Sequence, residues 1–406
     1  MPKVVVGMSG GIDSSVTAYL LKEQGYEVQG ISFLMWENPG RGAPACCSLR
    51  AIEQTSRVAG MIGIRHDVID VRDDFAEKVV APFIQAYTSG LTPNPCILCN
   101  RHIKFPHLMR EAEKRGAEYI ATGHYARIER QGQRIRRSED PSIVFDDIHQ
   151  RNAYLMKGVD PKKDQSYVLY SLNQDFLRRL ILPLGRLTKS DVRQIARECA
   201  ITAGESEESQ EICFIQGGNY LRFIQKICRV EMEPGPIRDL NGNMIGTHKG
   251  LYGYTIGQRK GLGIASPQPL YVIDIDFANN TVYAGSRDSA RKREFSVCDI
   301  QWITAPPSGS EHGGVSGQDE PVKSFRATVK VRSTMRAEPA TIYLDSNCMV
   351  QDADREKNKI ACCIDKPASS EIVRVVFDEP QWAPAPGQSA VFYAGDIVTG
   401  GGIIKR

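Results

Sequence analysis

The chain has 406 residues, of which 41% are hydrophobic and 24% are charged, and its formal net charge at pH 7 is +3. A chain of this length exceeds what one hydrophobic core usually organises, so we expect two or three domains. No segment approaches the roughly 20 consecutive apolar residues of a membrane-spanning helix, so we expect no membrane partner. The first strand pattern begins at Val4 and leaves no room for a targeting peptide, which favours a cytoplasmic location.

Strand and helix patterns alternate through the first half of the chain. Strands are expected at Val4–Met8, Val28–Phe33, Arg65–Val71 and Tyr119–Thr122, and helices at Ser14–Gln24, Leu49–Met61, Phe75–Tyr87, Lys104–Lys114 and Lys189–Ala200. Strands that alternate with helices predict right-handed crossovers and an α/β fold with a parallel sheet. Ligands of such sheets bind beyond the carboxyl ends of the strands. Ser9–Ser15 follows one such end, and Gly123-His124 follows another.

The most informative segment is the turn Ser9-Gly10-Gly11-Ile12-Asp13-Ser14-Ser15, which joins the first strand to the first helix. A strand, a glycine-rich turn and a helix N-terminus form an anion cradle, because backbone N–H groups and the helix dipole face the ligand. Gly10 and Gly11 allow close backbone approach, and the serine hydroxyls add donors. Asp13 suggests a Mg²⁺ partner for a bound polyphosphate. The pattern matches neither a Walker A loop nor a dinucleotide fingerprint.

The later parts of the chain have a different texture. Arg127–Asn152 interrupts the alternation and is expected to be a hairpin or loop, and glycines gather between Gly242 and Gly263. From about Glu294 short extended stretches are separated by glycine and proline, which predicts a small closed β-barrel, with a loop at Ser308–Glu320. We therefore predict an α/β domain over residues 1–217, a small central domain over 218–288 and a C-terminal barrel over 289–406.

Eleven cysteines are many for a cytoplasmic chain, where they are more often reduced, catalytic or metal-binding than paired in structural disulfides. Cys96 and Cys99 form a CxxC pair just before a helix pattern, and prolines stiffen the preceding loop, Thr92–Pro95. Thiols at a helix N-terminus ionise more readily than in solution. A third cysteine of interest is Cys213, in the segment ESQEICFI.

Motifs along the whole chain together resemble one known family. The first turn has the S-G-G-x-D-S-S pattern of the PP-loop of ATP pyrophosphatases, enzymes that adenylate a carbonyl and release pyrophosphate. The chain resembles the bacterial-type tRNA 2-thiouridylases through seven segments in order: GMSGGIDSSV, TPNPCILCNRHIKF, ATGHY, KDQSYVLY, ESQEICFI, GLYGYTIGQRKGLGI and PGQSAVFYAGDIVTGGGII. The resemblance implies a PP-loop catalytic domain of the adenine nucleotide α-hydrolase type, then a small middle domain and an RNA-contacting barrel.

The resemblance also implies a set of binding residues. ATP is expected to contact Gly7, Met8, Ser9, Gly10, Gly11, Ile12, Asp13, Ser14, Phe33 and Gly123. The anticodon stem-loop of tRNA is expected to contact Asn94, Pro95, Cys96, His124, Lys163, Asp164, Gln165, Arg332, Ser333 and Gln388. The target base must leave its stack for chemistry at C2, and the segment around Pro95 is expected to lie against it.

The implied reaction has two stages. ATP with Mg²⁺ adenylates the C2 oxygen of wobble uridine 34, and a sulfur nucleophile then displaces AMP at C2. Cys213 receives sulfur as a persulfide from a sulfur-donor protein. Cys99 attacks the persulfide, or releases sulfide by forming a disulfide with Cys213. Asp13, Cys99 and Cys213 are therefore the expected catalytic residues.

Position 96 departs from the family pattern and leaves several interpretations open. Many relatives have aspartate there, assigned to acid–base chemistry or to orienting the uracil, and Cys96 supplies no carboxylate. Cys96, Cys99 and Cys213 could instead hold a [4Fe–4S] cluster whose fourth iron binds sulfide. Cys96 could also be a spectator small apolar residue. One alternative function is another PP-loop ligase, acting on tRNA or forming an amide, which needs neither Cys99 nor Cys213. The other is a non-enzymatic RNA-binding or redox protein that uses the CxxC pair for disulfide exchange, and such a protein needs no intact first turn.

Overall fold

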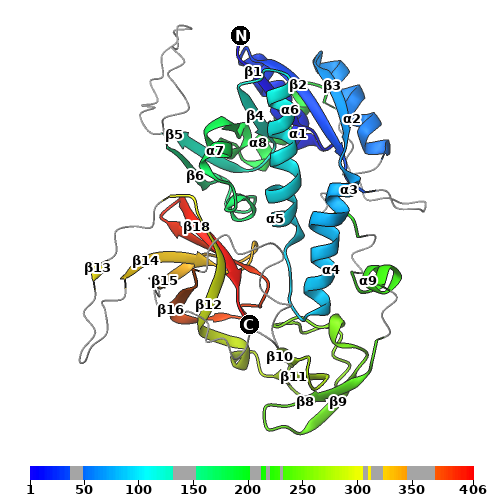
Figure 1. Ribbon diagram of the computed structural model, residues 1–406, viewed down its shortest axis with the longest axis vertical. Helices are drawn as coiled ribbons and strands as arrows, with labels where there is room; N and C mark the ends of the chain where they lie inside the picture. Colours follow the sequence, from blue (N-terminus) through cyan, green and yellow to red (C-terminus); the bar gives the residue numbers. More distant parts are fainter. Residues whose placement is uncertain are drawn as a thin grey trace. The chain divides into compact units, whose positions relative to one another are not determined.

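The computed structural model describes most of the chain. The described residues are 1–36, 49–130, 152–201, 212–215, 220–228, 232–304, 310–311, 323–344 and 371–406. The chain forms two compact units, which we describe one at a time (Figure 1). The first unit comprises residues 1–80, 95–218 and 396–399, and the second comprises residues 81–94, 219–395 and 400–406. The three-domain boundaries expected at 217 and 288 stay a prediction.

A five-stranded parallel sheet forms the centre of the first unit. Its strands are β1 (Lys3–Gly7), β2 (Glu27–Leu34), β3 (Arg65–Asp70), β4 (Tyr119–Thr122) and β7 (Leu180–Ile181), in the order β3-β2-β1-β4-β7. All four pairings are parallel. The run Val4-Val5-Val6 in β1 is buried on both faces, which is typical of an inner strand of a parallel sheet. The predicted parallel α/β fold is confirmed, and β7 is a strand that the sequence patterns missed.

Helical segments connect these strands. In the first unit they are α1 (Ile12–Glu23), α2 (Leu49–Ile62), α3 (Arg72–Phe75), η1 (Ala76–Val80), α5 (Pro95–Cys99), η2 (Asn100–Lys104), α6 (Phe105–Lys114), η3 (Ser166–Leu169), α7 (Gln174–Arg179), η4 (Pro183–Arg186) and α8 (Lys189–Glu198). The helix expected at Phe75–Tyr87 begins earlier, at Arg72, and passes through the π-helical η1 into α4 (Ala81–Thr88).

The helix expected at Lys104–Lys114 is confirmed as α6, which begins one residue later at Phe105. The sequence patterns missed the helical segments before it, because α5 begins at Pro95 and the π-helical η2 joins α5 to α6. Proline is favourable at a helix start, because its missing N–H would have no partner there. Cys96 and Cys99 therefore lie within the helix and not ahead of it. A π-helical turn directly after a CxxC pair is of interest, because such turns occur frequently at functional sites.

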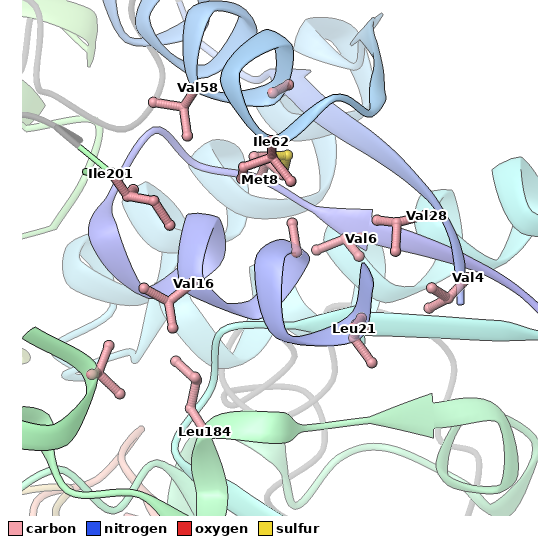
Figure 2. Close-up of a cluster of buried hydrophobic side chains, with 14 of the residues drawn as sticks. Val4, Val6, Met8, Val16, Leu21, Val28, Val58, Ile62, Leu184 and Ile201 are labelled. Carbon is pink, nitrogen blue, oxygen red and sulfur yellow. The ribbon is translucent and has the colours of Figure 1, made fainter. Parts of the chain in front are cut away.

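A hydrophobic core fixes the start of α1 relative to β1. Figure 2 shows Val16 and Leu21 of α1 together with Val6 of β1, Val58 of α2 and Leu184 of η4. Each of these five side chains is at most 2% exposed. Burial of one such side chain contributes about 1.5–3 kcal/mol, so the strand and the helix on either side of the first turn are held firmly.

An antiparallel pair of strands lies between β4 and β7 in the chain of the first unit. β5 (Ala126–Arg130) pairs with β6 (Ala153–Lys157), with Arg127 opposite Met156. The interruption expected at Arg127–Asn152 therefore has paired arms, in agreement with a hairpin. Its middle, residues 131–151, lies outside the described residues.

The second unit contains a small sheet and a closed barrel. The small sheet has the order β10-β11-β8-β9 and consists of β8 (Gly235–Arg238), β9 (Met244–His248), β10 (Tyr271–Asp276) and β11 (Thr281–Gly285). The helical segments of this unit are α4, α9 (Tyr220–Cys228), η6 (Leu251–Gly253) and η7 (Asp288–Ala290). None of the described helices in either unit has the length and apolar character needed to span a bilayer.

The barrel has six strands. They are β12 (Arg291–Trp302), β14 (Lys323–Lys330), β15 (Glu338–Leu344), β16 (Val373–Trp382), β17 (Ser389–Ala394) and β18 (Ile397–Ile404), and the short β13 (Ser310–Glu311) pairs with β14. The order is β12-β16-β15-β14-β17-β18, and pairing of β12 with β18 closes the barrel. Buried side chains such as Phe325, Ile342 and Phe392 fill it. The predicted closed barrel is confirmed; of the loop expected at Ser308–Glu320, residues 310–311 are described.

Candidate functional site

The turn between β1 and α1 has the geometry of an anion cradle. Gly11 occupies the N-cap of α1 in an extended conformation and has no side chain with which to cap the helix. The first N–H groups of α1 therefore receive no cap from the residue that usually provides one. Gly10 has φ +81°, and a Cβ there would lie 3.0 Å from the Ala51 carbonyl oxygen and from Thr55 Oγ1. The close turn thus requires glycine at position 10, and it presents the N-terminus of the 12-residue helix α1 to a ligand.

Two of the serine hydroxyls in the turn maintain its shape. Ser14 Oγ accepts a hydrogen bond from the Ser9 N–H at 3.1 Å and donates to the Gly11 carbonyl at 3.1 Å. Ser15 Oγ donates to the same carbonyl at 3.1 Å and is fully buried. The expectation that all three serines offer donors to a ligand is therefore modified, because Ser14 and Ser15 both donate their hydroxyl protons to the Gly11 carbonyl. Ser9 is the exposed member of the three.

The carboxylate of Asp13 is held by two protein donors. Lys189 Nζ, from the start of α8, lies 2.7 Å from Oδ1 and 2.9 Å from Oδ2, and the Tyr125 hydroxyl donates to Oδ1 at 2.7 Å. The side chain of Lys189 is 11% exposed and that of Asp13 is 32% exposed. This arrangement joins α1, α8 and the chain just beyond β4.

Direct Mg²⁺ ligation by Asp13 does not fit this arrangement. A carboxylate offers about four lone-pair positions, and protein donors already use three of those of Asp13. An ammonium group in contact with both oxygens also repels a second cation at the same place. Among the residues with described positions, no group of three or more His, Cys, Asp or Glu side chains is placed to hold a metal ion.

The end of β4 lies against the turn. A Cβ on Gly123 would lie 2.9 Å from both Asp13 C and Ser14 N, so this position admits only glycine. His124 Nδ1 lies 2.7 Å from Thr122 Oγ1, and burial together with the smaller effect of the Lys104 charge lowers the pKa of His124 to about 3. A neutral imidazole can interact with RNA by stacking or hydrogen bonding, and it carries no positive charge to pair with phosphate.

The other residues expected to contact ATP have side chains in the core. Met8 is 3% exposed, and Ile12 packs against the same core. Phe33 in β2 is 7% exposed and lies edge-to-face with His107, with ring centroids 6.0 Å apart. A Cβ on Gly7 would lie 3.4 Å from Leu108. Nucleotide contacts stay a prediction for Gly7, Met8, Ile12 and Phe33. At these positions the groups available for such contacts are the backbone N–H and C=O.

Both cysteine-bearing segments contact the two residues that follow β2. The Cys99 thiol, which is 4% exposed, lies 3.9 Å from Met35 Sδ. The neighbouring Trp36 packs against Phe214, the residue after Cys213, with ring centroids 6.4 Å apart. Because β2 is adjacent to β1 and parallel to it, these segments lie at the same edge of the sheet as the glycine-rich turn.

A third aromatic ring completes the attachment of the Cys213 segment. Phe75 at the end of α3 lies 5.5 Å from Phe214 and 6.5 Å from Trp36, measured between ring centroids. Phe214 is 1% exposed, whereas Cys213 is half-buried. The aromatic side chain therefore anchors the segment and leaves the adjacent thiol partly accessible.

A [4Fe–4S] cluster does not fit the three cysteines as they lie here. A cluster requires thiolates that converge on one point. Cys96 is exposed, Cys99 is buried and Cys213 is half-buried, and all three are thiols. They do not form a metal-binding group within the described part of the chain.

The expected tRNA-binding loop Lys163-Asp164-Gln165 is held against the end of β4. The carboxylate of Asp164 accepts from the N–H groups of Gly158 and Ser166 at 3.1 Å, and Gln165 Oε1 accepts from the Tyr125 N–H at 2.9 Å. These bonds fix the loop beside the residue that also holds Asp13. RNA contact by Lys163, Asp164 and Gln165 stays a prediction.

In the second unit, a barrel turn holds the loop that leads to the CxxC pair. Gln388 Nε2 donates to the Thr92 carbonyl at 2.8 Å, and the Thr92 N–H donates to the Pro386 carbonyl at 2.8 Å. Arg332 Nη2 donates to the carbonyls of Ile256 and Ala383 at 3.0 and 2.9 Å. These side chains have structural partners, and RNA contact by Arg332, Gln388, Asn94 and the exposed Ser333 stays a prediction.

Comparison with known proteins assigns the family. Family models described as a tRNA methyl transferase HUP domain, a tRNA methyl transferase PRC-barrel domain and an aminomethyltransferase beta-barrel domain match residues 2–217, 222–286 and 348–404. A protein named tRNA-specific 2-thiouridylase MnmA 1, from Caldanaerobacter subterraneus subsp. tengcongensis, is 42% identical over 100% of this chain and 98% of its own length. The chain belongs to the MnmA family of tRNA-specific 2-thiouridylases.

Other relatives agree with this assignment. The MnmA protein of Clostridioides difficile is 39% identical, and that of Carboxydothermus hydrogenoformans is 40% identical, each over 100% of this chain and 98% of the relative. A solved 4-thiouridine synthetase–RNA complex with bound ATP is 16% identical, with a TM-score of 0.33 over 55% of this chain and 50% of the other. The MnmA family membership therefore rests on the full-length sequence relatives.

Several residues of this MnmA family member were not singled out from the sequence. Lys189 and Tyr125 lie 176 and 112 positions from Asp13, so no local spacing connects them. Trp36 and Phe75 are likewise remote from Phe214 in the chain, at 178 and 139 positions. One signal was available for Lys189, because Thr188 and Asp191 form a capping box and so mark a helix start at a lysine.

Proposed function

We propose that this chain is a tRNA uridine 2-sulfurtransferase that uses ATP to activate the C2 oxygen of the wobble uridine and replaces that oxygen with sulfur. The observation that carries the proposal is the common position of an anion cradle and two thiol-bearing segments at one edge of one sheet. Membership of the 2-thiouridylase family supports it. A tRNA substrate, an ATP cosubstrate and a cytoplasmic location follow from the same reasoning.

In the first stage the cradle binds the polyphosphate of ATP. The uridine O2 attacks the α-phosphorus, the bond from that phosphorus to the bridging oxygen breaks, and pyrophosphate leaves. The O2–AMP adduct then carries a good leaving group at C2. The N–H groups at the start of α1 stabilise the charge that develops on the phosphates. Mg²⁺ is proposed as the ion that enters with ATP, because Asp13 is already held by Lys189.

In the second stage sulfur replaces the activated oxygen. The terminal sulfur of a Cys213 persulfide attacks C2 and AMP leaves, which gives a C2–S–S–Cys213 adduct. The Cys99 thiolate then attacks Cys213 Sγ, a Cys99–Cys213 disulfide forms, and the sulfur remains on C2 as the thiocarbonyl. A cellular dithiol restores both thiols, and a sulfur-donor protein reloads Cys213. The persulfide route is favoured over a [4Fe–4S] cluster because the three cysteines do not converge.

The target base is proposed to lie against the loop that precedes α5. A base must be extruded from the anticodon stack before C2 becomes accessible. Within the second unit, bonds from Gln388 and Pro386 to Thr92 hold the first part of this loop, close in the chain to Asn94. The exposed Cys96 is assigned to base contact, without the acid–base role of the aspartate in other family members.

The proposal is tested with purified protein, tRNA transcript, ATP and a persulfide-generating desulfurase. We expect tRNA-dependent pyrophosphate release and sulfur at C2 of the wobble uridine by mass analysis. Cys99→Ser and Cys213→Ser should retain pyrophosphate release and lose thiolation. Cys298→Ser is the matched control, because this buried barrel thiol donates to the Ile403 carbonyl and serine preserves that bond.

Three outcomes would contradict the proposal. Full thiolation by both Cys99→Ser and Cys213→Ser would show that these cysteines do not transfer the sulfur. Incorporation of ammonia or an amine would indicate another PP-loop ligase. A methylated uridine, which mass analysis separates from a thiolated one, would favour the activity named in the descriptions of the matching domain models.

A further inference from the structure

Asp13 presents an electrostatic problem at the proposed phosphate site. It lies in the first turn of α1, where the uncapped N–H groups would meet the polyphosphate. A carboxylate a few ångströms from a polyphosphate opposes its binding, and the effect is large in a partly buried site. The structure resolves this conflict with a protein cation, because Lys189 Nζ lies within 2.9 Å of both carboxylate oxygens.

Lys189 is held at both ends. Its backbone N–H donates to Asp160 Oδ2 at 3.1 Å, and it begins a helix that the Thr188–Asp191 capping box stabilises. Its ammonium group also lies 5.8 Å from the centroid of the Tyr125 ring. A lysine fixed in this way loses little freedom when a ligand binds, so its charge is pre-organised.

From these observations we infer that Lys189 is a phosphate-binding residue of the ATP site, and that Asp13 and Tyr125 are positioning residues that hold its ammonium group toward the pyrophosphate leaving group. Lys189 thus takes the place that a Mg²⁺ ligated by Asp13 would occupy. This inference rests on the proposed function, because it takes the ligand of the turn to be ATP. It assigns to Asp13 an indirect role in place of metal ligation.

The test measures equilibrium binding of ATP, AMP and inorganic pyrophosphate to the full chain. Lys189→Met should weaken ATP and pyrophosphate binding about 100-fold, with AMP binding nearly unchanged, because the lost cation faces the leaving phosphates. Lys189→Arg keeps the charge and should recover affinity to within about tenfold of the wild type, since guanidinium geometry differs from that of ammonium. Lys114→Met is the matched control, because Lys114 pairs with Glu111 at 2.8 Å and is largely exposed.

A double variant separates phosphate binding from structural neutralisation of Asp13. Asp13→Asn/Lys189→Met removes both charges and avoids leaving one partly buried and unpaired. We expect its thermal midpoint to lie near that of the wild type and its ATP and pyrophosphate affinity to stay low. Wild-type affinity in the double variant would overturn the inference, as would an equal loss for AMP and ATP in Lys189→Met.

The proposed function is judged separately, on the wild-type protein. If the wild type with tRNA releases no pyrophosphate, the proposed function fails, whereas the binding comparison still decides the role of Lys189. If pyrophosphate is released, the kinetics add a second readout. Lys189→Met should then raise the KM for ATP and lower kcat, and the KM for tRNA should be unchanged.

Discussion

Replacing Phe214 by alanine should separate the two stages of the reaction. Phe214 is 1% exposed and packs against Phe75 and Trp36, with ring centroids 5.5 and 6.4 Å away. Phe→Ala in a packed core costs about 3–5 kcal/mol. The ring belongs to the segment that carries Cys213, so we expect the loss to fall on the position of that segment and not on the sheet.

The size of the effect follows from this local cost. About 3 kcal/mol corresponds to a reduction of roughly 100-fold in the equilibrium constant for attachment of the segment. Thiolation should therefore fall by up to about two orders of magnitude, with tRNA-dependent pyrophosphate release within about twofold of the wild type. Phe214→Leu should recover part of the loss, because leucine restores much of the buried volume.

The assay measures pyrophosphate release and 2-thiouridine formation on the same samples. Phe295→Ala is the matched control, because Phe295 packs against Phe377 in the barrel with ring centroids 5.8 Å apart. It should destabilise the barrel without separating the two stages. The reasoning is refuted if Phe214→Ala thiolates at the wild-type rate, or if both stages fall equally.

Three further predictions address the surroundings of the site. Gly123→Ala should lower the free energy of unfolding by about 1–3 kcal/mol and weaken ATP binding. Gly60→Ala, whose Cβ meets nothing within 4 Å, should stabilise helix α2 by about 1 kcal/mol. Thermal melts with and without ATP test both variants. Because the pKa of His124 is lowered to about 3 in the folded chain, only the unfolded chain binds a proton at this residue between about pH 6.5 and 3. The free energy of unfolding should therefore decrease by up to about 1.4 kcal/mol for each unit by which the pH is lowered through this range. Urea unfolding of His124→Asn should show a smaller decrease. Gln388→Ala should raise the KM for tRNA several-fold and leave the KM for ATP unchanged, because it frees the Thr92 loop; equal changes in both would contradict this role.

Local patterns predicted much of the fold. The alternation of strand and helix patterns predicted four of the five strands of the parallel sheet. The reason is clearest for β1, because an inner parallel strand must be apolar on both faces. Short extended stretches with glycine and proline between them predicted the barrel. The helical segment that begins at Pro95 was missed, because the π-helical η2 joins α5 to α6 and periodicity treats these two helices as separate.

The glycine-rich turn and the CxxC pair were readable from the chain because each consists of residues a few positions apart. A glycine-rich turn between a strand and a helix favours anion binding, since the backbone supplies the donors. The attachment of Lys189 to Asp13, and of Phe214 to Trp36 and Phe75, was not readable. These contacts join segments far apart in the chain, and packing of the sheet and its helices brings them together.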